Sequence, residues 1–323
     1  MDYPVQISVV MPTYNTDISM LKEAVDSILN QTFKDFEFII IDDGSANGTW
    51  DYLNALTDQR VKLIRNETNL GISKSLNIGL RAASGKYIAR MDADDIALPS
   101  RFEKQYAYME NHPDVLVCGT DWAPLGKSEK HKRKMIRDPE KYNIRLLFNC
   151  PGPAHPTVMM NRRLLDEYQV FYREDLKYAE DYMLFSDTVP HGKVSCVEEV
   201  LLYYRYHDKQ VSCAKQKEQM HYAILVQQKL LKELLGTATY EEACNHYRWA
   251  CDMKKKGFKD SLKCFKWYSR LIKENLNKKI YNRNKLAQYV SRLYLQLILP
   301  STIISFAYTC SIKLSRLMRN KER

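Results

Sequence analysis

The chain has 323 residues, of which 45% are hydrophobic and 27% are charged; this is the composition of a globular protein with a sizeable core, and no repeat or low-complexity tract interrupts it. The net charge of +10 is uneven, because residues 215–323 hold 23 Lys/Arg and 8 Asp/Glu whereas residues 1–214 hold 26 and 31. A basic final third suits an anionic lipid surface, an anionic substrate or a nucleic acid, and a solvated helical face is the simpler alternative.

The start of the chain and its cysteines favour a cytoplasmic protein. Residues 1–4 run directly into a strand-like stretch, without the basic and apolar parts of a secretory signal. The eight cysteines include no pair at CxxC spacing, so neither a zinc knuckle nor a redox motif is expected. Scattered cysteines in a chain of this length fit reduced thiols rather than a disulfide framework.

The first 120 residues alternate between strand-like and helix-like stretches. Short apolar runs predict strands, and apolar side chains at helical spacing predict the helices between them. Gly85 is expected to end the third helix as its C′ residue. The alternation predicts a mostly parallel sheet with helices on both faces. The predicted strands are 7–11, 36–41, 61–64 and 87–91, and the predicted helices contain 21–29, 50–56 and 76–80.

The rest of the chain changes character twice. Between residues 115 and 212 we predict strands at 115–119, 157–160 and 200–204, a helix at 182–189 and a stiff proline-rich loop at 151–156. After Ser212 the pattern predicts mostly helix, with Lys/Arg on the polar face. The predicted domains are therefore an α/β domain of residues 1–214 and a basic helical extension of residues 215–323.

Polar residues follow the strands at the edge where parallel sheets bind ligands. The densest group is the acidic turn after the fourth strand, where three carboxylates within four residues repel one another unless a cation offsets them. Oxygen ligands of this kind suit Mg²⁺ or Mn²⁺. A solvated acidic turn or a helix N-cap is the alternative. The groups are Pro12-Thr13-Tyr14 after the first strand, Asp42-Asp43 after the second, and Asp92, Asp94 and Asp95 after the fourth.

Three further groups have a functional and a plain structural interpretation. Glu180-Asp181 begins a predicted helix and is either capping charge or a general base. His155 taken singly is more often structural. Arg205 and His207 are two residues apart on an extended stretch, so both side chains point to one face, which would suit a diphosphate. The chain lacks GxGxxG, GxxxxGK[ST] and GxSxG, the markers of dinucleotide oxidoreductases, P-loop NTPases and α/β-hydrolases.

Taken in order, these motifs resemble the family 2 glycosyltransferases of the GT-A fold. The resemblance covers roughly residues 5–212, and the order of the motifs makes it specific. The motifs are Val9-Val10-Met11-Pro12-Thr13-Tyr14-Asn15, Ser27-Ile28-Leu29-Asn30-Gln31-Thr32, Ile41-Asp42-Asp43-Gly44-Ser45, Asn69-Leu70-Gly71, Asn77-Ile78-Gly79, Asp92-Ala93-Asp94-Asp95, Glu180-Asp181, and Tyr204-Arg205 with His207, Gln210 and Ser212.

The resemblance implies a GT-A fold, with a Rossmann-like, mostly parallel sheet, and a role for each motif. Asp43, or else Asp42, would contact the base, expected to be uracil, and His207 would help to hold the diphosphate. Asp181 would be the catalytic base, with Glu180 beside it. In the family's DxD motif, Asp94 would be the direct ligand of Mn²⁺ or Mg²⁺, with Asp92 and Asp95 as further ligands. The nucleotide-sugar site would comprise Pro12, Thr13, Tyr14, Asp42, Asp43, Asn69, Gly71, Asn77, Asp92, Arg205 and His207.

The implied reaction moves one sugar from a nucleotide diphosphate, expected to be UDP, to an acceptor hydroxyl. A dication would offset the charge of the leaving diphosphate. Asp181 would deprotonate the acceptor hydroxyl, which attacks from the opposite face and inverts the anomeric carbon. No QxxRW follows the base and no set of long transmembrane helices is visible, so we expect single-sugar addition, in polysaccharide or glycolipid biosynthesis, rather than polymer synthesis.

Two other functions fit parts of the sequence. A sugar-nucleotide nucleotidyltransferase would need a glycine-rich loop after the first strand, which Pro12–Asn15 does not supply. A nucleic-acid-binding protein could use the basic tail, where Trp249 and Trp267 lie near lysines. No nucleic-acid motif is present, so we expect no nucleic-acid partner.

An uncharged stretch near the C-terminus suggests a membrane contact. Residues 293–312 carry no charge and are followed by several basic residues. The stretch is long enough to span a bilayer, but Pro300 and several polar residues interrupt it. We expect helices lying on the anionic inner face of the cell membrane, and a lipid-linked saccharide as the acceptor. A soluble helical pair is the alternative.

Overall fold

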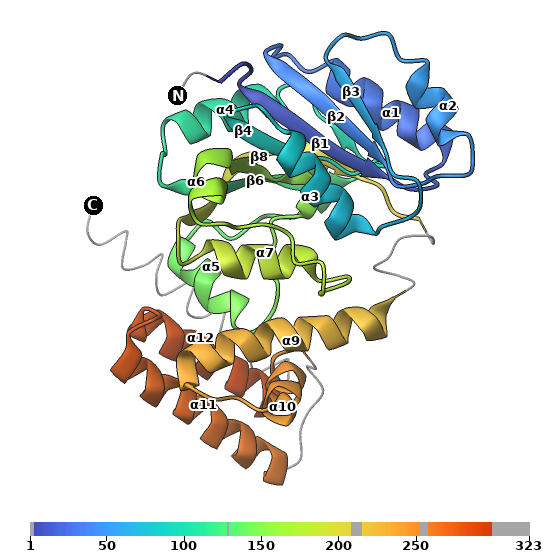
Figure 1. The fold of residues 1–323 in the computed structure, drawn as a ribbon. Helices are drawn as coiled ribbons and strands as arrows, with labels where there is room; N and C mark the ends of the chain where they lie inside the picture. The colour runs from blue at the N-terminus through green and yellow to red at the C-terminus, as the bar shows by residue number, and fades with distance from the viewer. Residues whose placement is uncertain (1–2, 128, 208–214, 252–257, 299–323) are drawn as a thin grey trace. The chain divides into compact units, whose positions relative to one another are not determined.

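The computed structural model describes residues 3–127, 129–207, 215–251 and 258–298, and Figure 1 shows its ribbon. The chain divides into two compact units. The α/β unit contains residues 1–142 and 150–226, and the helical unit contains residues 143–149 and 227–323. The predicted domain boundary at residue 214 lies outside the described residues and stays a prediction.

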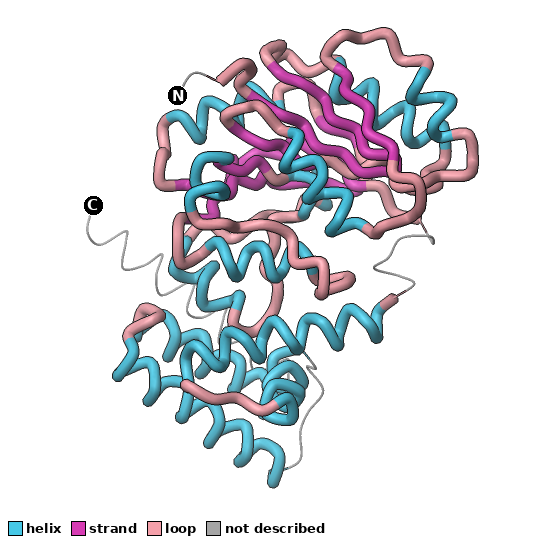
Figure 2. The backbone as a smooth tube through the Cα atoms, viewed as in Figure 1, coloured by secondary structure: helices cyan, strands magenta, loops and turns pink. Residues whose placement is uncertain are grey.

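A mixed sheet forms the centre of the α/β unit (Figure 2). Within the described residues its strand order is β3-β2-β1-β4-β7-β6-β8-β5. The strands are β1 (Ile7–Thr13), β2 (Phe36–Asp42), β3 (Val61–Arg65), β4 (Tyr87–Arg90), β5 (Ile96–Ala97), β6 (Val115–Pro124), β7 (Met159–Asn161) and β8 (Lys193–Tyr204).

The strands β3, β2, β1 and β4 pair in parallel, as the alternation predicts. β6 and β8 are also parallel, whereas β7 and β5 run antiparallel to their neighbours. The expected mostly parallel α/β sheet is therefore confirmed. β1 lies between β2 and β4, so the residues that follow these three strands meet at one edge.

Helices cover both faces of the sheet because β1 and β2 are apolar on both sides. The helix α3 packs on β1 and β2 from one face, and α1 and α4 contribute to the core on the other. The helices of this unit are α1 (Ile18–Leu29), α2 (Thr49–Asn54), α3 (Ile72–Ala82), α4 (Arg101–Glu110), α6 (Arg162–Glu167) and α7 (Glu180–Thr188), with the short 3-10 helices η1 (Glu129–His131) and η2 (His155–Thr157). Helix α5 (Pro139–Leu146) begins in this unit and ends in the helical unit.

The predicted role of Gly85 as a C′ residue is wrong. Helix α3 ends at Ala82, with Ala83 extended as its cap, and Gly85 does not adopt a positive φ. The glycine is needed because it passes close to β1, where an added Cβ would lie 2.6 Å from the backbone nitrogen of Ser8. The glycine therefore permits close approach to β1.

Several boundaries in the second half of the unit differ from the prediction. Strands β6 and β8 are longer than expected, because they pair with each other over most of their length through three register shifts. The predicted strand at 157–160 is shared between η2 and β7. Strand β5 has only two residues, too short for a periodic pattern, and forms through its pairing with β8.

The helical unit confirms the predicted helical C-terminal region. Buried His246 connects its parts: Nε2 donates to the carbonyl of Leu147 at 2.8 Å, and Nδ1 accepts from Trp267 at 2.9 Å. Burial lowers the pKa of His246 to about 4, so the ring is neutral near pH 7. The helices are α9 (Gln216–Leu235), which begins in the α/β unit, α10 (Tyr240–Cys251), α11 (Phe258–Lys278) and α12 (Arg283–Ile298).

None of the described helices combines the length and the apolar character that crossing a membrane requires. Helix α12 contains the start of the uncharged stretch 293–312, and residues 299–312 lie outside the described residues. The expectation that this stretch lies on a membrane therefore stays a prediction.

Candidate active site

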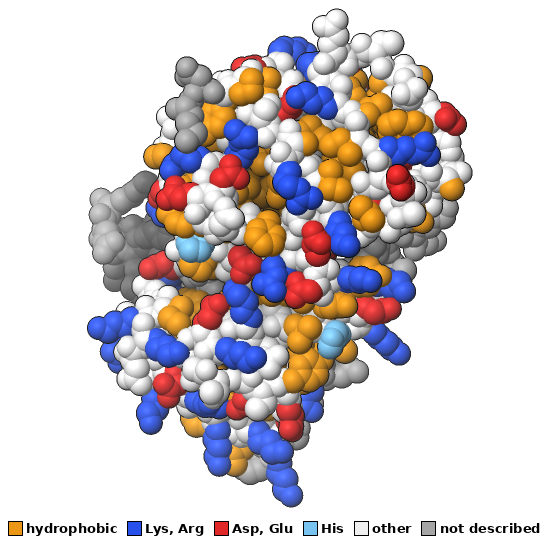
Figure 3. Space-filling model, in the orientation of Figure 1, with side chains coloured by type: hydrophobic (Ala, Val, Ile, Leu, Met, Phe, Trp, Pro, Cys, Tyr) orange, Lys and Arg blue, Asp and Glu red, His pale blue; other side chains and the backbone are white. Residues whose placement is uncertain are grey.

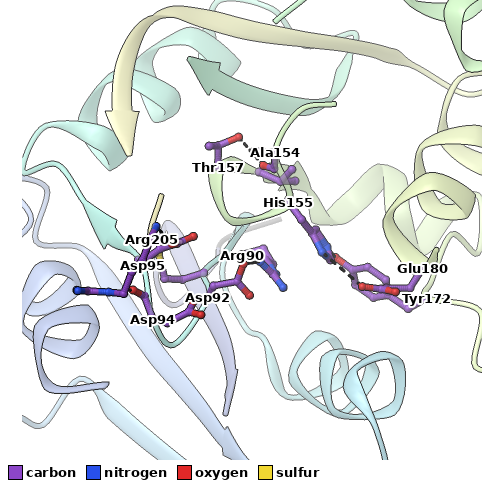
Figure 4. A network of polar contacts seen from close by, with 12 residues as sticks. Arg90, Asp92, Asp94, Asp95, Ala154, His155, Thr157, Tyr172, Glu180 and Arg205 are labelled. Atoms are coloured by element: carbon purple, nitrogen blue, oxygen red, sulfur yellow. Dashed lines mark hydrogen bonds and ion pairs between the residues drawn. The ribbon is translucent and has the colours of Figure 1, made fainter. Parts of the chain in front are cut away.

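Three carboxylates gather in the turn after β4. Asp92, Asp94 and Asp95 each present an oxygen, and these oxygens lie within 4.8 Å of one another (Figure 4). Asp95 is only 1% exposed, and its Oδ1 accepts the backbone N–H of Arg205 at 2.8 Å. Its Oδ2 is buried and has no hydrogen-bond partner. The turn is therefore neither a solvated acidic loop nor the N-cap of α4, whose N-cap is Ser100.

Burial and mutual repulsion oppose ionisation of this group. Burial, followed by the charges of Asp92 and Asp94, raises the pKa of Asp95 well above its ordinary value. Burial and Asp92 also raise the pKa of Asp94, against the effect of His207, whose Nε2 lies 2.8 Å from Asp94 Oδ2. A bound cation would relieve this repulsion.

The donor set fits a hard divalent cation. All the ligand atoms are carboxylate oxygens, which suit Mg²⁺ or Mn²⁺, and the unpartnered Oδ2 of Asp95 is available. One oxygen of Asp92 is already paired with Arg90 Nη1 at 2.5 Å. Asp94 and Asp95 would therefore hold the ion most directly, with the remaining oxygen of Asp92 as a further ligand.

Arg205 and His207 both contact Asp94 of the acidic turn. The guanidinium of Arg205 donates to the backbone carbonyl of Asp94 at 2.7 Å and pairs with Glu23. Together with the Asp94–His207 contact, this ties the end of β8 to the turn after β4. Gln210 and Ser212 of the same motif lie outside the described residues.

The expected base-binding residue Asp43 organises a loop. Its Oδ1 accepts from the side chain of Asn66 at 2.8 Å and from the backbone of Leu70 at 2.9 Å, and its Oδ2 accepts from the backbone of Gly71 at 2.9 Å. Gly71 has φ of 89°, a conformation that favours glycine. Asn66 was missed by the sequence reasoning, because a single asparagine after a strand resembles an ordinary turn residue.

The other residues at this edge of the sheet differ in burial and in hydrogen bonding. Asp42 is buried and accepts the backbone N–H of Ser45 at 3.0 Å, with Arg65 3.7 Å from its second oxygen. The carbonyl of Thr13 accepts from the backbone of Asp43 at 2.9 Å, which joins the ends of β1 and β2. Pro12 is buried within β1, whereas Tyr14 and Asn69 are exposed at the loops that follow.

Asn77 makes its contacts within the protein. Its side chain donates to the carbonyl of Tyr172 at 2.8 Å and accepts from the backbone N–H of the same residue at 3.0 Å. A second donation reaches Glu174 at 3.2 Å. Asn77 therefore fixes the segment around Tyr172, and its expected proximity to the nucleoside stays a prediction.

Glu180 and Asp181 form a second acidic pair in the first turn of α7. Burial, followed by the charge of Asp181, raises the pKa of Glu180 to about 7, and Glu180 Oε2 is buried without a hydrogen-bond partner. Burial also raises the pKa of Asp181, whose Oδ1 accepts the N–H of Tyr182 at 2.6 Å. Carboxylates with raised pKa values are suited to accept a proton near neutral pH.

Arg90, at the end of β4, was missed by the sequence reasoning. Figure 4 shows its side chain between Asp92 on one side and His155, Tyr172 and Glu180 on the other. Although burial opposes its charge, Asp92 raises the pKa of Arg90. An arginine at the end of an otherwise buried strand is the signal that could have indicated it.

His155 is a buried, neutral neighbour of this pair. Burial, followed by the charge of Arg90, lowers its pKa well below the ordinary value. Its Nε2 lies 2.7 Å from the hydroxyl of Tyr172, and its Nδ1 lies 4.0 Å from Glu180 Oε1. The contacts fit the structural interpretation of His155, as a buried residue that packs beside Tyr172 and Glu180.

Comparisons with known proteins identify the family of this chain. A family model described as glycosyl transferase family 2 matches residues 8–169. The chain belongs to this family. An uncharacterized glycosyltransferase of Methanocaldococcus jannaschii is 37% identical to this glycosyltransferase over 231 residues, which are 69% of this chain and 78% of that protein.

Two further matches extend the comparison. The Escherichia coli enzyme WfgD, named as a UDP-Glc:alpha-D-GlcNAc-diphosphoundecaprenol beta-1,3-glucosyltransferase, is 27% identical over 211 residues, or 65% of this chain and 80% of that protein. The crystal structure of S. aureus TarS 1–349 with UDP-GlcNAc has a TM-score of 0.59 at 19% identity, and the match covers 91% of this chain and 84% of that chain. The structural match confirms the GT-A fold of this glycosyltransferase.

Proposed function

We propose that this family 2 glycosyltransferase is a metal-dependent, inverting enzyme that transfers one sugar from a UDP-sugar to an acceptor hydroxyl. The observation that carries the proposal is that two acidic groups lie on either side of Arg90. One is the turn of Asp92, Asp94 and Asp95, where the buried Oδ2 of Asp95 has no partner, and the other is the pair Glu180 and Asp181, whose pKa values are raised by burial. UDP as the nucleotide is supported by the TarS complex and by the donor in the name of the E. coli relative.

The chain's residues divide into a donor side and a base side. On the donor side, Asp94 and Asp95 would hold Mn²⁺ or Mg²⁺, which when bound offsets the charge that develops on the leaving diphosphate. The loop that Asp43 holds, with Gly71, and the end of β1, with Tyr14, would border the nucleotide. His207 would contribute to the diphosphate site from its position beside Asp94.

On the base side, Asp181 would take the proton of the acceptor hydroxyl, with Glu180 beside it. Both carboxylates are largely buried, and burial raises both pKa values, that of Glu180 to about 7. Arg90 would limit the repulsion between the two acidic groups, because its positive charge lies between them. An attack from the face opposite the diphosphate inverts the anomeric carbon without a covalent intermediate.

The acceptor is proposed to be a lipid-linked saccharide, so that the enzyme would work at the inner face of the cell membrane in surface polysaccharide or glycolipid synthesis. The E. coli relative, whose name gives an acceptor on diphosphoundecaprenol, supports this class. The predicted single-sugar addition is part of the same proposal.

A donor-hydrolysis screen tests the function directly. Purified enzyme is incubated with UDP-, GDP- and dTDP-sugars in the presence of Mn²⁺, and nucleotide release is measured. We expect release from a UDP-sugar, dependent on the metal and reduced by Asp94→Asn. Once an acceptor is found, NMR of the product from an α-linked donor should show a β linkage. Metal-independent turnover contradicts the metal's role, and an α-linked product contradicts inversion.

A further inference from the structure

Helix α11 has two faces of different chemistry, both within the helical unit. One face is buried in the core of the unit, through residues such as Cys264, Tyr268 and Leu271. The other face exposes large apolar side chains: Leu262 is 45% exposed, and Phe265 is 52% exposed. A globular core does not need apolar side chains on its solvent side, and contiguous exposed apolar surface marks an interaction site.

The exposed apolar side chains form one stripe along α11. Residues 262, 265 and 276 fall on one side of an α-helix, because the spacings of 3 and 14 residues return to within about 60° of the starting direction. Leu276 is 42% exposed at the far end of this stripe. The ring of Phe265 lies 5.5 Å from that of Tyr294 in α12, and the next residue, Leu295, is 46% exposed. The apolar surface therefore reaches the neighbouring helix.

A row of lysines borders this stripe. Helix α11 carries six Lys/Arg against two Asp/Glu. One of the two acids, Asp260, forms an ion pair with Arg248, whose Nη2 lies 2.9 Å from Asp260 Oδ1. Among the described residues, no ion pair involves the exposed lysines of α11, which stand near the stripe on the helix surface: Lys259, Lys263, Lys266 and Lys273. Figure 3 shows Lys and Arg side chains, in blue, over the helical unit as well as over the α/β unit.

We propose that this α11 surface, defined by Leu262, Phe265 and Leu276 with the four lysines Lys259, Lys263, Lys266 and Lys273, docks on an anionic lipid bilayer. The apolar side chains would enter the boundary between headgroups and acyl chains, and the lysines would reach the lipid phosphates, because their long stems lie along apolar surface while the ammonium groups stay in water. This proposal rests on the proposed function, which places the enzyme at the membrane, and it names the residues that would make the contact.

The apolar stripe and the lysines together favour an anionic bilayer over a nucleic acid as the partner of this surface. A nucleic acid would contact the lysines through its phosphates but would leave the apolar stripe in water. An anionic bilayer satisfies both, since the negative surface attracts the lysines and the interface buries the stripe. Attraction of this kind weakens as salt rises, because the lysines are exposed.

Vesicle flotation of the full-length enzyme tests the proposal. The probe is a vesicle of phosphatidylglycerol and phosphatidylethanolamine, compared at low salt with a vesicle of phosphatidylcholine alone. We expect the wild type to float with the anionic vesicle. Lys263→Glu with Lys266→Glu should lower the bound fraction by about tenfold or more, given about fivefold per basic residue near the surface. Leu262→Ser with Phe265→Ser should lower it by a similar factor, because two large apolar side chains no longer gain burial in the interface.

Matched controls separate the surface from general effects. Met220→Ser removes an exposed apolar side chain of α9, and Lys34→Glu with Lys217→Glu makes the same change of net charge elsewhere. These variants should float like the wild type. Thermal melting should be unchanged in every variant, because the substituted side chains are exposed.

The possible results are decisive for this surface. Equal flotation of the α11 variants and the wild type, no flotation of the wild type with anionic vesicles, or an equal loss in the controls would each overturn the proposal. A duplex DNA that displaces the enzyme from the vesicles at equal phosphate concentration would favour the nucleic acid instead. Donor hydrolysis measured without vesicles should be the same in the α11 variants as in the wild type. If the wild type itself hydrolyses no donor, the proposed function fails, and that result is independent of the flotation result.

Discussion

His207 Nε2 lies 2.8 Å from Asp94 Oδ2, although 113 residues separate them in the chain. The contact joins the end of β8 to the turn after β4, beside the N–H of Arg205 that binds Asp95. The acidic turn is therefore held from outside its own loop, which keeps three mutually repelling carboxylates within reach of one ion.

We expect Asp94→Asn to lower turnover by about 10²-fold or more, on the scale of losing one key electrostatic stabiliser. The substitution keeps the shape of the side chain and removes the charge that would hold the metal. Nucleotide release from a UDP-sugar, measured across a Mn²⁺ titration, checks this. Asp51→Asn, at an exposed acid in α2, is the matched control. Full activity in excess EDTA would contradict the proposed requirement for a metal.

Asp181→Asn should abolish transfer while donor binding remains largely intact. The reason is that the base acts on the acceptor hydroxyl and not on the nucleotide. Isothermal calorimetry with UDP and Mn²⁺ gives the donor affinity, and an acceptor assay gives the transfer rate. If the affinity for UDP disappears together with transfer, Asp181 belongs to the donor site and its assignment as the base is wrong.

The pKa of Glu180, raised to about 7, predicts opposite effects of pH on activity and stability. Transfer should increase as pH rises through about 7, because the negative charge that Glu180 then gains beside Asp181 makes Asp181 a stronger proton acceptor. The free energy of unfolding should decrease over the same rise, since an unfolded Glu has already lost its proton at lower pH while the folded one retains it.

Glu180→Gln separates these two effects. At pH 8 it should raise the free energy of unfolding by about 1–3 kcal/mol, because the buried charge is removed, and it should flatten the dependence of stability on pH between 5 and 8. Chemical denaturation at several pH values measures both quantities. A variant as pH-dependent as the wild type would show that the raised pKa belongs to another group.

Asn66→Ala tests the loop that borders the proposed nucleotide site. Asn66 donates to Asp43 at 2.8 Å and to Ser75 at 3.1 Å, and removing it leaves a buried carboxylate with one donor fewer. We expect a loss of about 1–3 kcal/mol in the free energy of unfolding and a weaker affinity for UDP. Asn54→Ala, at an exposed position of α2, should change neither. Unchanged UDP affinity in a destabilised variant would place the loop away from the nucleotide.

Much of the fold and part of the site could be predicted from local patterns. The strand at 7–11 and the helix around residues 21–29 appear as β1 and α1, because apolar periodicity decides which side chains can be buried. The two-residue strand β5 and the packing role of Gly85 could not be predicted, since each depends on a partner distant in the chain.

The sequence by itself determined the family, the mostly parallel sheet and the carboxylates at the strand ends, because these follow from the order of residues along the chain. Only the tertiary structure decided that Arg90 lies between Asp92 and Glu180 and that Glu180 has a raised pKa. The same holds for the hydrogen bond between the side chain of Asn77 and the backbone of Tyr172. The physical reason is that a pKa and a hydrogen-bond partner depend on burial and on charges brought close by folding. Local periodicity records which side chains are buried, but not what they are buried against.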